Sequence, residues 1–133
     1  MAENSKIRML LVDDNDVLRS GLVIFIDAFD DLQLVGECRT SLEAVELCAQ
    51  VQPDVVLMDL KMPVMGGVTA TKIIGQRFPS IRVIALISFD EEPLIQSAKQ
   101  ARVYDCLLKN VTIDAMAEVI RKAYRDGKTA LQT

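Results

Sequence analysis

The sequence predicts an α/β fold, a three-layer αβα sandwich built on a five-stranded parallel sheet. Short apolar runs alternate with segments of helical period, and the alternation repeats five times along the 133 residues. Two of the runs, Asp54–Met58 and Ile81–Ile87, are almost wholly apolar, as is typical of central strands buried on both faces. Strands that alternate with helices pair in parallel through right-handed crossovers, which places helices on both faces of the sheet.

The expected strands are runs that are apolar, or that alternate in polarity, and that stop at polar or turn residues. Each has the length of an ordinary strand, about four to eight residues. They are expected at Ile7–Val12, Leu32–Glu37, Asp54–Met58, Ile81–Ile87 and Val103–Leu108.

The expected helices carry apolar residues three or four positions apart. The first has Leu18, Leu22, Phe25 and Phe29 on one face, with Asn15 or Asp16 as its N-cap. The second, Ser41–Gln50, has Leu42, Val45 and Ala49 on one face, with Thr40 or Ser41 as its cap. A loop over Met62–Gly67 leads to helices at Val68–Phe78, Glu91–Lys99 (Pro93 in its first turn) and Ile113–Arg125. The last carries Met116, Val119, Ile120 and Ala123 on one face, and Gly127 is expected to stop it.

Length and composition predict a single domain over residues 1–126, with 127–133 as a tail or the start of a linker. The formal net charge of −4, without a basic cluster, argues against nucleic-acid binding by this chain, because neutralising phosphates requires concentrated Lys and Arg. The sequence has no signal-peptide pattern and no apolar run near the roughly 20 residues of a membrane span. We therefore expect a cytoplasmic protein that does not bind membranes.

The three cysteines, Cys38, Cys48 and Cys106, are widely spaced and form no CxxC pair. This spacing favours reduced, partly buried thiols over a disulfide. Because the chain also has no histidine, a zinc site is not expected.

Polar side chains follow four of the five expected strands. They are Asp13 and Asp14 after the first strand, Asp59 after the third, Ser88 after the fourth and Lys109 after the fifth. In an open parallel α/β sheet, ligands bind outside the carboxyl ends of the strands. The sequence thus predicts that three carboxylates, a hydroxyl and an ammonium group converge at one edge.

Three neighbouring carboxylates repel one another unless a cation neutralises them. Oxygen ligands without sulfur or nitrogen match a hard divalent ion, Mg²⁺ or Mn²⁺. Because Mg²⁺ keeps several waters and coordinates phosphate oxygens, the edge suits a phosphoryl group. A carboxylate beside such an ion and a lysine can attack phosphorus to form an acyl phosphate, and the two cations would spread the charge that grows on the transferring oxygens.

Each of these residues also has an ordinary structural interpretation. Asp13 and Asp14 precede a helix and can serve to cap it, Asp59 can be a turn residue, and Lys109 a solvated lysine. The functional interpretation depends on their joint occurrence at successive strand ends.

The segments that carry these residues resemble the receiver domain of bacterial two-component response regulators. The matching motifs are VDDN at 12–15, PDVVLMDLKMPVMGG at 53–67 and LLK at 107–109, and the resemblance runs from about Lys6 to Leu131. GECRTSLEAVEL and the closing GKTAL resemble the NarL/LuxR-type subfamily most closely. The resemblance implies a flavodoxin-like (βα)5 fold, a sensor histidine kinase as partner, and a homodimer. It also implies transcriptional output through a helix-turn-helix DNA-binding domain absent from these residues.

By position, the resemblance makes Asp59 the phosphoacceptor. Asp13, Asp14, Asp59 and the backbone carbonyl of Lys61 would hold Mg²⁺, and Lys109 would contact the phosphoryl oxygens. The donor would be a phosphohistidine of the kinase or a small-molecule acyl phosphate. Such a domain is a signalling module rather than an enzyme, apart from phosphoryl transfer to its own aspartate and the hydrolysis that follows.

Two positions that report phosphorylation in the family differ here. Ile87 stands where the fourth strand normally ends in Thr or Ser, and Ser88 follows one residue later, on the opposite face by strand alternation. Cys106 stands where the fifth strand normally has an aromatic residue, and 101–103 reads Ala-Arg-Val in place of the usual Ala-Gly-Ala. We therefore expect Asp59 to be phosphorylated without the usual Thr/Tyr coupling.

Three other functions share parts of this pattern. A degenerate receiver, acting as a phosphorylation-independent interaction module, is favoured by Ile87 and Cys106 and opposed by the complete acidic set with its lysine. A haloacid-dehalogenase-type phosphatase needs an acid two residues after the nucleophile, where this chain has Lys61. A flavodoxin-like electron carrier binds the flavin phosphate in its first loop, which an acidic Asp13-Asp14 pair would repel.

Overall fold

Five strands and five helices alternate along the chain in a computed structural model that describes residues 6–61, 66–88 and 92–132. The strands are β1 (Ile7–Val12), β2 (Leu32–Cys38), β3 (Val55–Asp59), β4 (Arg82–Ile87) and β5 (Asp105–Leu108). The helices are α1 (Asp16–Asp27), α2 (Ser41–Val51), α3 (Gly67–Arg77), α4 (Glu92–Gln100) and α5 (Ile113–Gln132). The five predicted strands are all present: β1 has the predicted range, and the ends of the other strands differ from it by at most two residues.

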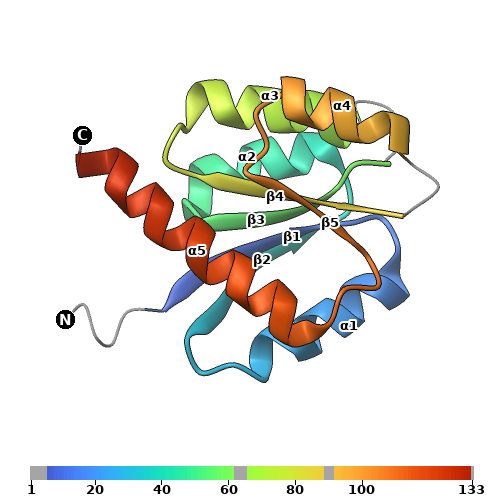
Figure 1. The fold of residues 1–133 in the computed structure, drawn as a ribbon, viewed down its shortest axis with the longest axis vertical. Helices are drawn as coiled ribbons and strands as arrows, with labels where there is room; N and C mark the ends of the chain where they lie inside the picture. The colour runs from blue at the N-terminus through green and yellow to red at the C-terminus, as the bar shows by residue number, and fades with distance from the viewer. Residues whose placement is uncertain (1–5, 62–65, 89–91, 133) are drawn as a thin grey trace.

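The strands form one parallel sheet in the order β2-β1-β3-β4-β5. Helices α1 and α5 lie on one face of this sheet, and α2, α3 and α4 lie on the other (Figure 1). The predicted three-layer αβα sandwich is confirmed. The order places β1 and β3 side by side in the middle, so that their carboxyl ends are neighbours.

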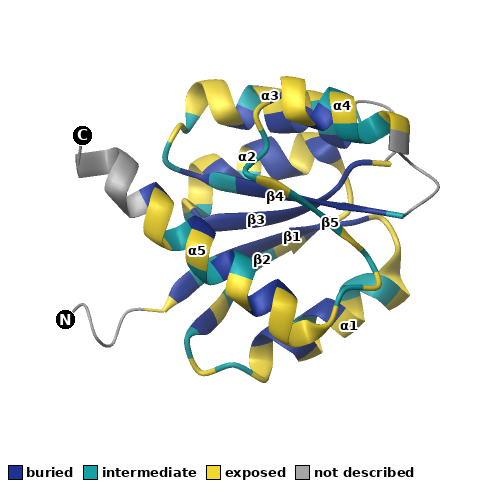
Figure 2. Cartoon of the chain, in the orientation of Figure 1, coloured by how far each residue is buried: buried dark blue, intermediate teal, exposed yellow. Residues whose placement is uncertain are grey.

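Two apolar cores, one on each face of the sheet, hold the layers together. Along β3, Val56 and Met58 pack toward α2, α3 and α4, whereas Val55 and Leu57 pack toward α1 and α5. Figure 2 shows the buried strands in the middle and the exposed residues on the outward sides of the helices. The near-continuous burial of β3 is what the unbroken apolar run in the sequence predicts.

The structure decides between the alternative helix caps. The Asn15 side chain accepts a hydrogen bond from the backbone N–H of Leu18 at 3.0 Å and caps α1. The Thr40 hydroxyl accepts one from the backbone N–H of Glu43 at 3.2 Å and caps α2. These bonds satisfy N–H groups that the first turn of each helix leaves without partners.

The predicted inner face of α2 is wrong in part. Val45 is buried as expected, but Leu42 is 58% exposed and Ala49 is also exposed. The residues that face the sheet are Ser41, Ala44, Val45 and Cys48. Their small side chains let α2 lie close to the sheet and to α3. The rotation of the helix about its axis is therefore set by this close packing, and not by burial of its largest apolar side chain.

The prediction that Gly127 stops the last helix is also wrong, because α5 continues to Gln132. Gly127 is buried, and a Cβ atom there would lie 3.1 Å from the Ser80 carbonyl oxygen. The glycine therefore allows α5 to approach the start of β4. The predicted inner face of α5 is confirmed by the burial of Met116, Ile120 and Ala123.

The boundary predicted after residue 126 falls inside α5, and the assignment of 127–133 to a tail or linker stays a prediction. Of the expected Met62–Gly67 loop, residues 62–65 lie outside the described part, and Gly67 begins α3. The expected first residue of the fourth helix, Glu91, also lies outside it, and Pro93 is in the first turn of α4 as predicted. None of the helices in the described residues is long and apolar enough to cross a membrane.

The three cysteines are free thiols, two buried (Cys38 and Cys48) and one half-buried (Cys106). Burial raises the pKa of the Cys38 and Cys48 thiols to about 12. They are therefore protonated at neutral pH, which makes them structural rather than reactive.

Candidate functional site

Three carboxylates meet at the carboxyl ends of β1 and β3. Asp13 follows β1 directly, Asp59 ends β3, and Asp14 is the next residue of the β1–α1 loop. One oxygen from each of the three lies within 4.8 Å of the others. Asp13 and Asp59 are only 1% and 3% exposed, whereas Asp14 is open to solvent. The predicted convergence of the three acids is present.

Lys109 brings a positive charge to the same place. Its Nζ atom lies 3.4 Å from Oδ1 of Asp59, and its backbone N–H donates to the Ile87 carbonyl at 2.9 Å, which fixes the residue at the end of β5. The backbone N–H of Lys61 donates to the same Asp59 oxygen at 3.0 Å. Two donors thus hold the Asp59 carboxylate in one orientation, and both use Oδ1.

Asp13 does not cap α1, since Asn15 has that role. Its Oδ1 accepts a hydrogen bond from the Asn15 N–H at 2.8 Å, which shapes the loop instead. Its Oδ2 is buried without a hydrogen-bond partner among the described residues. A buried carboxylate oxygen without a partner is costly, so this atom indicates a place for a positive ligand.

The electrostatics of Asp13 and Asp59 also indicate a place for a positive ligand. Burial raises the pKa of Asp59 to about 6, and the negative charge of Asp13 adds to the rise, against the opposing effects of the Lys61 N–H and the Lys109 charge. Burial also raises the pKa of Asp13. Lys109 alone therefore does not neutralise the cluster. Oxygen-only donors, a buried oxygen without a partner among the described residues and carboxylates with raised pKa values together fit a hard divalent cation.

Arg19 is a part of the site that the sequence analysis missed. Its guanidinium donates to the Asp13 carbonyl at 2.7 Å, to Asp16 at 2.8 Å and to Glu37 at 2.8 Å. It therefore ties the loop that bears Asp13 to α1 and β2. The spacing of Asp16 and Arg19 could have predicted an ion pair on α1, but the bond to a backbone carbonyl has no signal in the sequence.

Gly67 is a second missed residue. A Cβ atom at this position would clash with the Asp59 carbonyl oxygen and would lie 2.6 Å from Cα of Leu60. The N–H of Gly67 donates to the Leu60 carbonyl at 3.1 Å. The first turn of α3 thus rests on the backbone at the end of β3, which only glycine permits. The motif at 53–67 contains this pair of glycines, but the sequence alone does not show that Gly67 lies against the end of β3.

The predicted switch residues lie in β4, directly after it and in β5. Ile87 is 2% exposed and packs with Val83 and Ala85 in the core beneath α3 and α4, and Cys106 packs against the same core. Ser88 is half-buried and directly follows β4. Position 87 therefore presents an apolar side chain that belongs to the core.

The fold and this edge are those of a signalling receiver. The sequence matches the response regulator receiver domain family over residues 9–121. The chain belongs to this family and is a receiver domain of two-component response regulators.

Curated relatives support the assignment. The chain is 37% identical over 127 residues to the transcriptional regulatory protein LiaR of Bacillus subtilis, a match that covers 96% of this chain and 60% of that protein. It is 34% identical over 120 residues to the response regulator protein VraR of Staphylococcus saprophyticus, covering 90% and 57%. The chain spans less than two thirds of the length of these relatives.

Solved structures agree with the fold. The response regulator domain of Thermotoga maritima CheB matches with a TM-score of 0.82 at 33% identity, covering 90% of this chain and 97% of that one. A LuxR-family DNA-binding response regulator from Staphylococcus aureus matches with a TM-score of 0.82 at 25% identity, covering 89% and 98%. The predicted resemblance to the LuxR-type subfamily and the flavodoxin-like receiver fold are confirmed.

Proposed function

We propose that this receiver domain accepts a phosphoryl group on Asp59 in a reaction that requires Mg²⁺ or Mn²⁺. The observation that carries the proposal is the buried Asp13–Asp59 pair with Lys109 Nζ 3.4 Å from the Asp59 carboxylate. Structural capping does not account for this arrangement, because Asn15 caps the helix. A turn role for Asp59 does not explain its burial beside a second acid.

Asp59 supplies the nucleophile. Because Lys61 and Lys109 both contact Oδ1, we assign Oδ2 as the attacking atom. It forms a bond to phosphorus while the bond between phosphorus and the donor's leaving atom breaks, and the leaving group takes the electron pair of that bond. Lys109 is placed to hold the phosphoryl oxygens as their charge shifts, which is electrostatic stabilisation of the transition state.

Asp13, Asp14 and Asp59 would hold the cation, with the Lys61 backbone carbonyl as a further ligand. The bound cation supplies charge neutralisation for the approach of an anionic phosphoryl group to an anionic pocket. Asp13 Oδ2 is the oxygen best prepared for it, being buried and without a partner among the described residues. Arg19 keeps this ligand in place through its bond to the Asp13 carbonyl.

The donor would be a phosphohistidine on a sensor histidine kinase or a small-molecule acyl phosphate. The output would be regulation of transcription through a DNA-binding domain, as the longer relatives are named transcriptional regulators. A homodimer and a cytoplasmic location fit the same function.

A second candidate function, a phosphorylation-independent interaction module, is favoured by one observation. Ile87 fills the core where the family's hydroxyl would report the phosphoryl group, and Cys106 takes the place of the reporting aromatic residue. Phosphorylation would then occur without changing the surface of β4 and β5.

The test combines a small-molecule phosphodonor such as acetyl phosphate with intact-mass measurement. We expect the wild-type protein to gain the mass of one phosphoryl group with Mg²⁺ and to gain none in EDTA. Asp59→Asn should gain none in either condition, whereas Asp54→Asn, a matched control at the opposite end of β3, should behave as wild type. An equal gain in Asp59→Asn would contradict the proposal.

The second candidate is separated from the first by a phosphoryl mimic. Amide chemical shifts recorded with and without beryllofluoride and Mg²⁺ should change around Asp13, Asp59 and Lys109. We expect small changes along β4 and β5 if the usual coupling is lost. Large changes along both strands would contradict that loss.

A further inference from the structure

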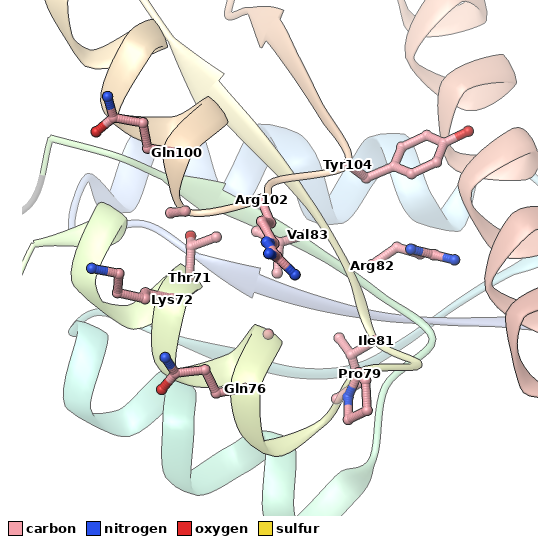
Figure 3. Close-up of a pocket in the computed structure, with 12 residues that line it drawn as sticks. Thr71, Lys72, Gln76, Pro79, Ile81, Arg82, Val83, Gln100, Arg102 and Tyr104 are labelled. Atoms are coloured by element: carbon pink, nitrogen blue, oxygen red, sulfur yellow. The ribbon is translucent and has the colours of Figure 1, made fainter.

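A hollow of about 610 Å³ opens at the edge of the sheet opposite to the acid cluster. It lies between α3, the start of β4, the end of α4 and the segment before β5 (Figure 3). Its volume is within the range of small-molecule sites, about 300–1,000 Å³. We propose that this hollow binds a small, multiply charged phosphorylated molecule through Arg102 and Lys72.

The lining of the hollow is positive in a protein whose net charge is −4. Lys72 comes from α3, Arg82 from β4 and Arg102 from the segment after α4, and among the residues that the structure describes no Asp or Glu lines the hollow. Gln76 and Gln100 add carboxamide donors at the rim. Cations from several elements, with neutral donors and no competing acid, are the chemistry that recognises phosphate groups.

Two of the three cations are available to a ligand. Arg82 is held in place: its Nη2 donates to the Asp126 carbonyl at 3.0 Å, and its guanidinium lies 5.7 Å from the centre of the Tyr104 ring. Among the residues that the structure describes, neither Lys72 nor Arg102 forms an ion pair. Arg82 therefore contributes a fixed positive field, and the other two contribute contacts.

The backbone of Arg102 gives a second, independent reason. Its φ angle is +68°, in the left-handed region that favours glycine. The N–H of Arg102 donates to the Lys99 carbonyl at 3.1 Å, and the N–H of Val103 donates to the Ala98 carbonyl at 3.2 Å. This pair of hydrogen bonds is typical of a helix end at which the left-handed residue is a glycine. An arginine here is strained, so we infer that its side chain has a use.

Figure 3 shows where that side chain goes: the Arg102 guanidinium lies over the middle of the hollow, between Thr71 of α3 and Arg82 of β4. Lys72 and Gln76 stand on α3, and in this view their polar ends are directed away from Arg102, toward the outer rim. Arg102 is exposed, and it is one of the residues that line the hollow.

The hollow is separate from the acceptor site. Arg82 pairs with Val55 and Leu86 with Asp59, so the two sites lie four residues apart along β4, about 13 Å. Ligand binding would not require Asp59, and the proposal stands or falls independently of phosphoryl acceptance.

The test is a titration of the full chain with pyrophosphate and with ATP, in EDTA so that no metal occupies the acid cluster. Amide chemical shifts report the place of binding and calorimetry the affinity. We expect saturable binding, with shifts confined to α3, the end of α4, the segment before β5 and the start of β4. Tighter binding of ATP than of pyrophosphate would assign a nucleotide, and equal binding would assign the phosphate groups alone.

Two variants make the test specific. Arg102→Gly should weaken binding at least about tenfold, since it removes charge-assisted hydrogen bonds. It should also raise the Tm by about 3 °C, because glycine relieves the left-handed backbone. Gln52→Gly is the matched control: Gln52 also has a left-handed backbone, with φ +49°, but does not line the hollow. It should raise the Tm and leave binding unchanged.

Lys72→Gln should weaken binding without changing the Tm. Unchanged affinity in both Arg102→Gly and Lys72→Gln would overturn the proposal, as would shifts centred on Lys109. Binding that does not saturate, or binding of poly-glutamate in place of either phosphate compound, would overturn it too.

Discussion

The carboxyl edge of the sheet has two halves of opposite character. Where β1 and β3 end, buried polar groups crowd together: Asp13 and Asp59 are almost wholly covered, and Lys109 reaches across to them. Where β4 ends, one strand away, Ile87 is equally covered but packs among apolar side chains. The two halves are joined by direct strand pairing, since Asp59 pairs with Leu86.

Under the proposed function, this difference separates the residues that receive a phosphoryl group from those that would report it. Reception needs only charges at fixed distances, and the β1–β3 half supplies them. Reporting needs a polar side chain that can leave its packed position and form a hydrogen bond to the phosphoryl group. A fully packed isoleucine has no such alternative partner, so the β4 half stabilises the fold instead.

The largest expected effect comes from removing the positive charge of Lys109 beside Asp59. Lys109→Ala should slow phosphorylation of Asp59 by about 100-fold, the usual consequence of losing one group that stabilises the transition state. The rate is measured by intact mass over time with acetyl phosphate and Mg²⁺. Lys122→Ala, at an exposed position of α5, should match wild type. If the Lys109→Ala protein is folded and is phosphorylated at the wild-type rate, Lys109 does not take part in phosphoryl transfer.

A smaller effect concerns the free energy of unfolding, which the buried Asp59 carboxylate lowers. The pKa of Asp59 is about 6 in the folded chain, against 3.8 as the ordinary value. Between these pH values the folded state binds more protons than the unfolded state, so stability falls as the pH rises. Above pH 6 the full deficit of about 2–3 kcal/mol is present.

Asp59→Asn removes this titration. In EDTA the variant should gain about 2 kcal/mol over wild type on going from pH 4 to pH 7, as measured by urea unfolding. Saturating Mg²⁺ should close most of the gap by stabilising the wild type. A difference between the two proteins that is the same at pH 4 and pH 7 would show that burial of Asp59 is not costly.

The same contrast explains how much could be predicted from the sequence. Periodicity and the unbroken apolar run of β3 predict a central sheet with helices on both faces. A strand that is buried on both faces needs apolar residues at nearly every position, and this pattern is visible in the sequence. The acids Asp13 and Asp59 and the lysine are visible because strand ends share one edge.

Close approaches are what the sequence does not reveal. Gly67 against the Asp59 carbonyl, Gly127 against Ser80 and the small inner face of α2 depend on distances between elements. Each concerns how near two backbones lie, and neither periodicity nor propensity records that distance. The exposure of Leu42 has the same origin, since helix rotation follows the closest packing.

The smallest predicted effect tests the apolar half with two variants of nearly equal shape. Ile87→Val leaves a small cavity and should cost about 1 kcal/mol of unfolding free energy. Ile87→Thr removes the same volume but buries a hydroxyl among apolar side chains, and should cost about 1 kcal/mol more. Urea unfolding measures both, and neither should change the rate of phosphorylation, since the side chain at position 87 packs in the apolar core on the side of α3 and α4. If Thr is as stable as Val, the hydroxyl has a polar partner at this position. Position 87 would then belong to the polar half, and beryllofluoride should shift β4 and β5 more in Ile87→Thr than in Ile87→Val.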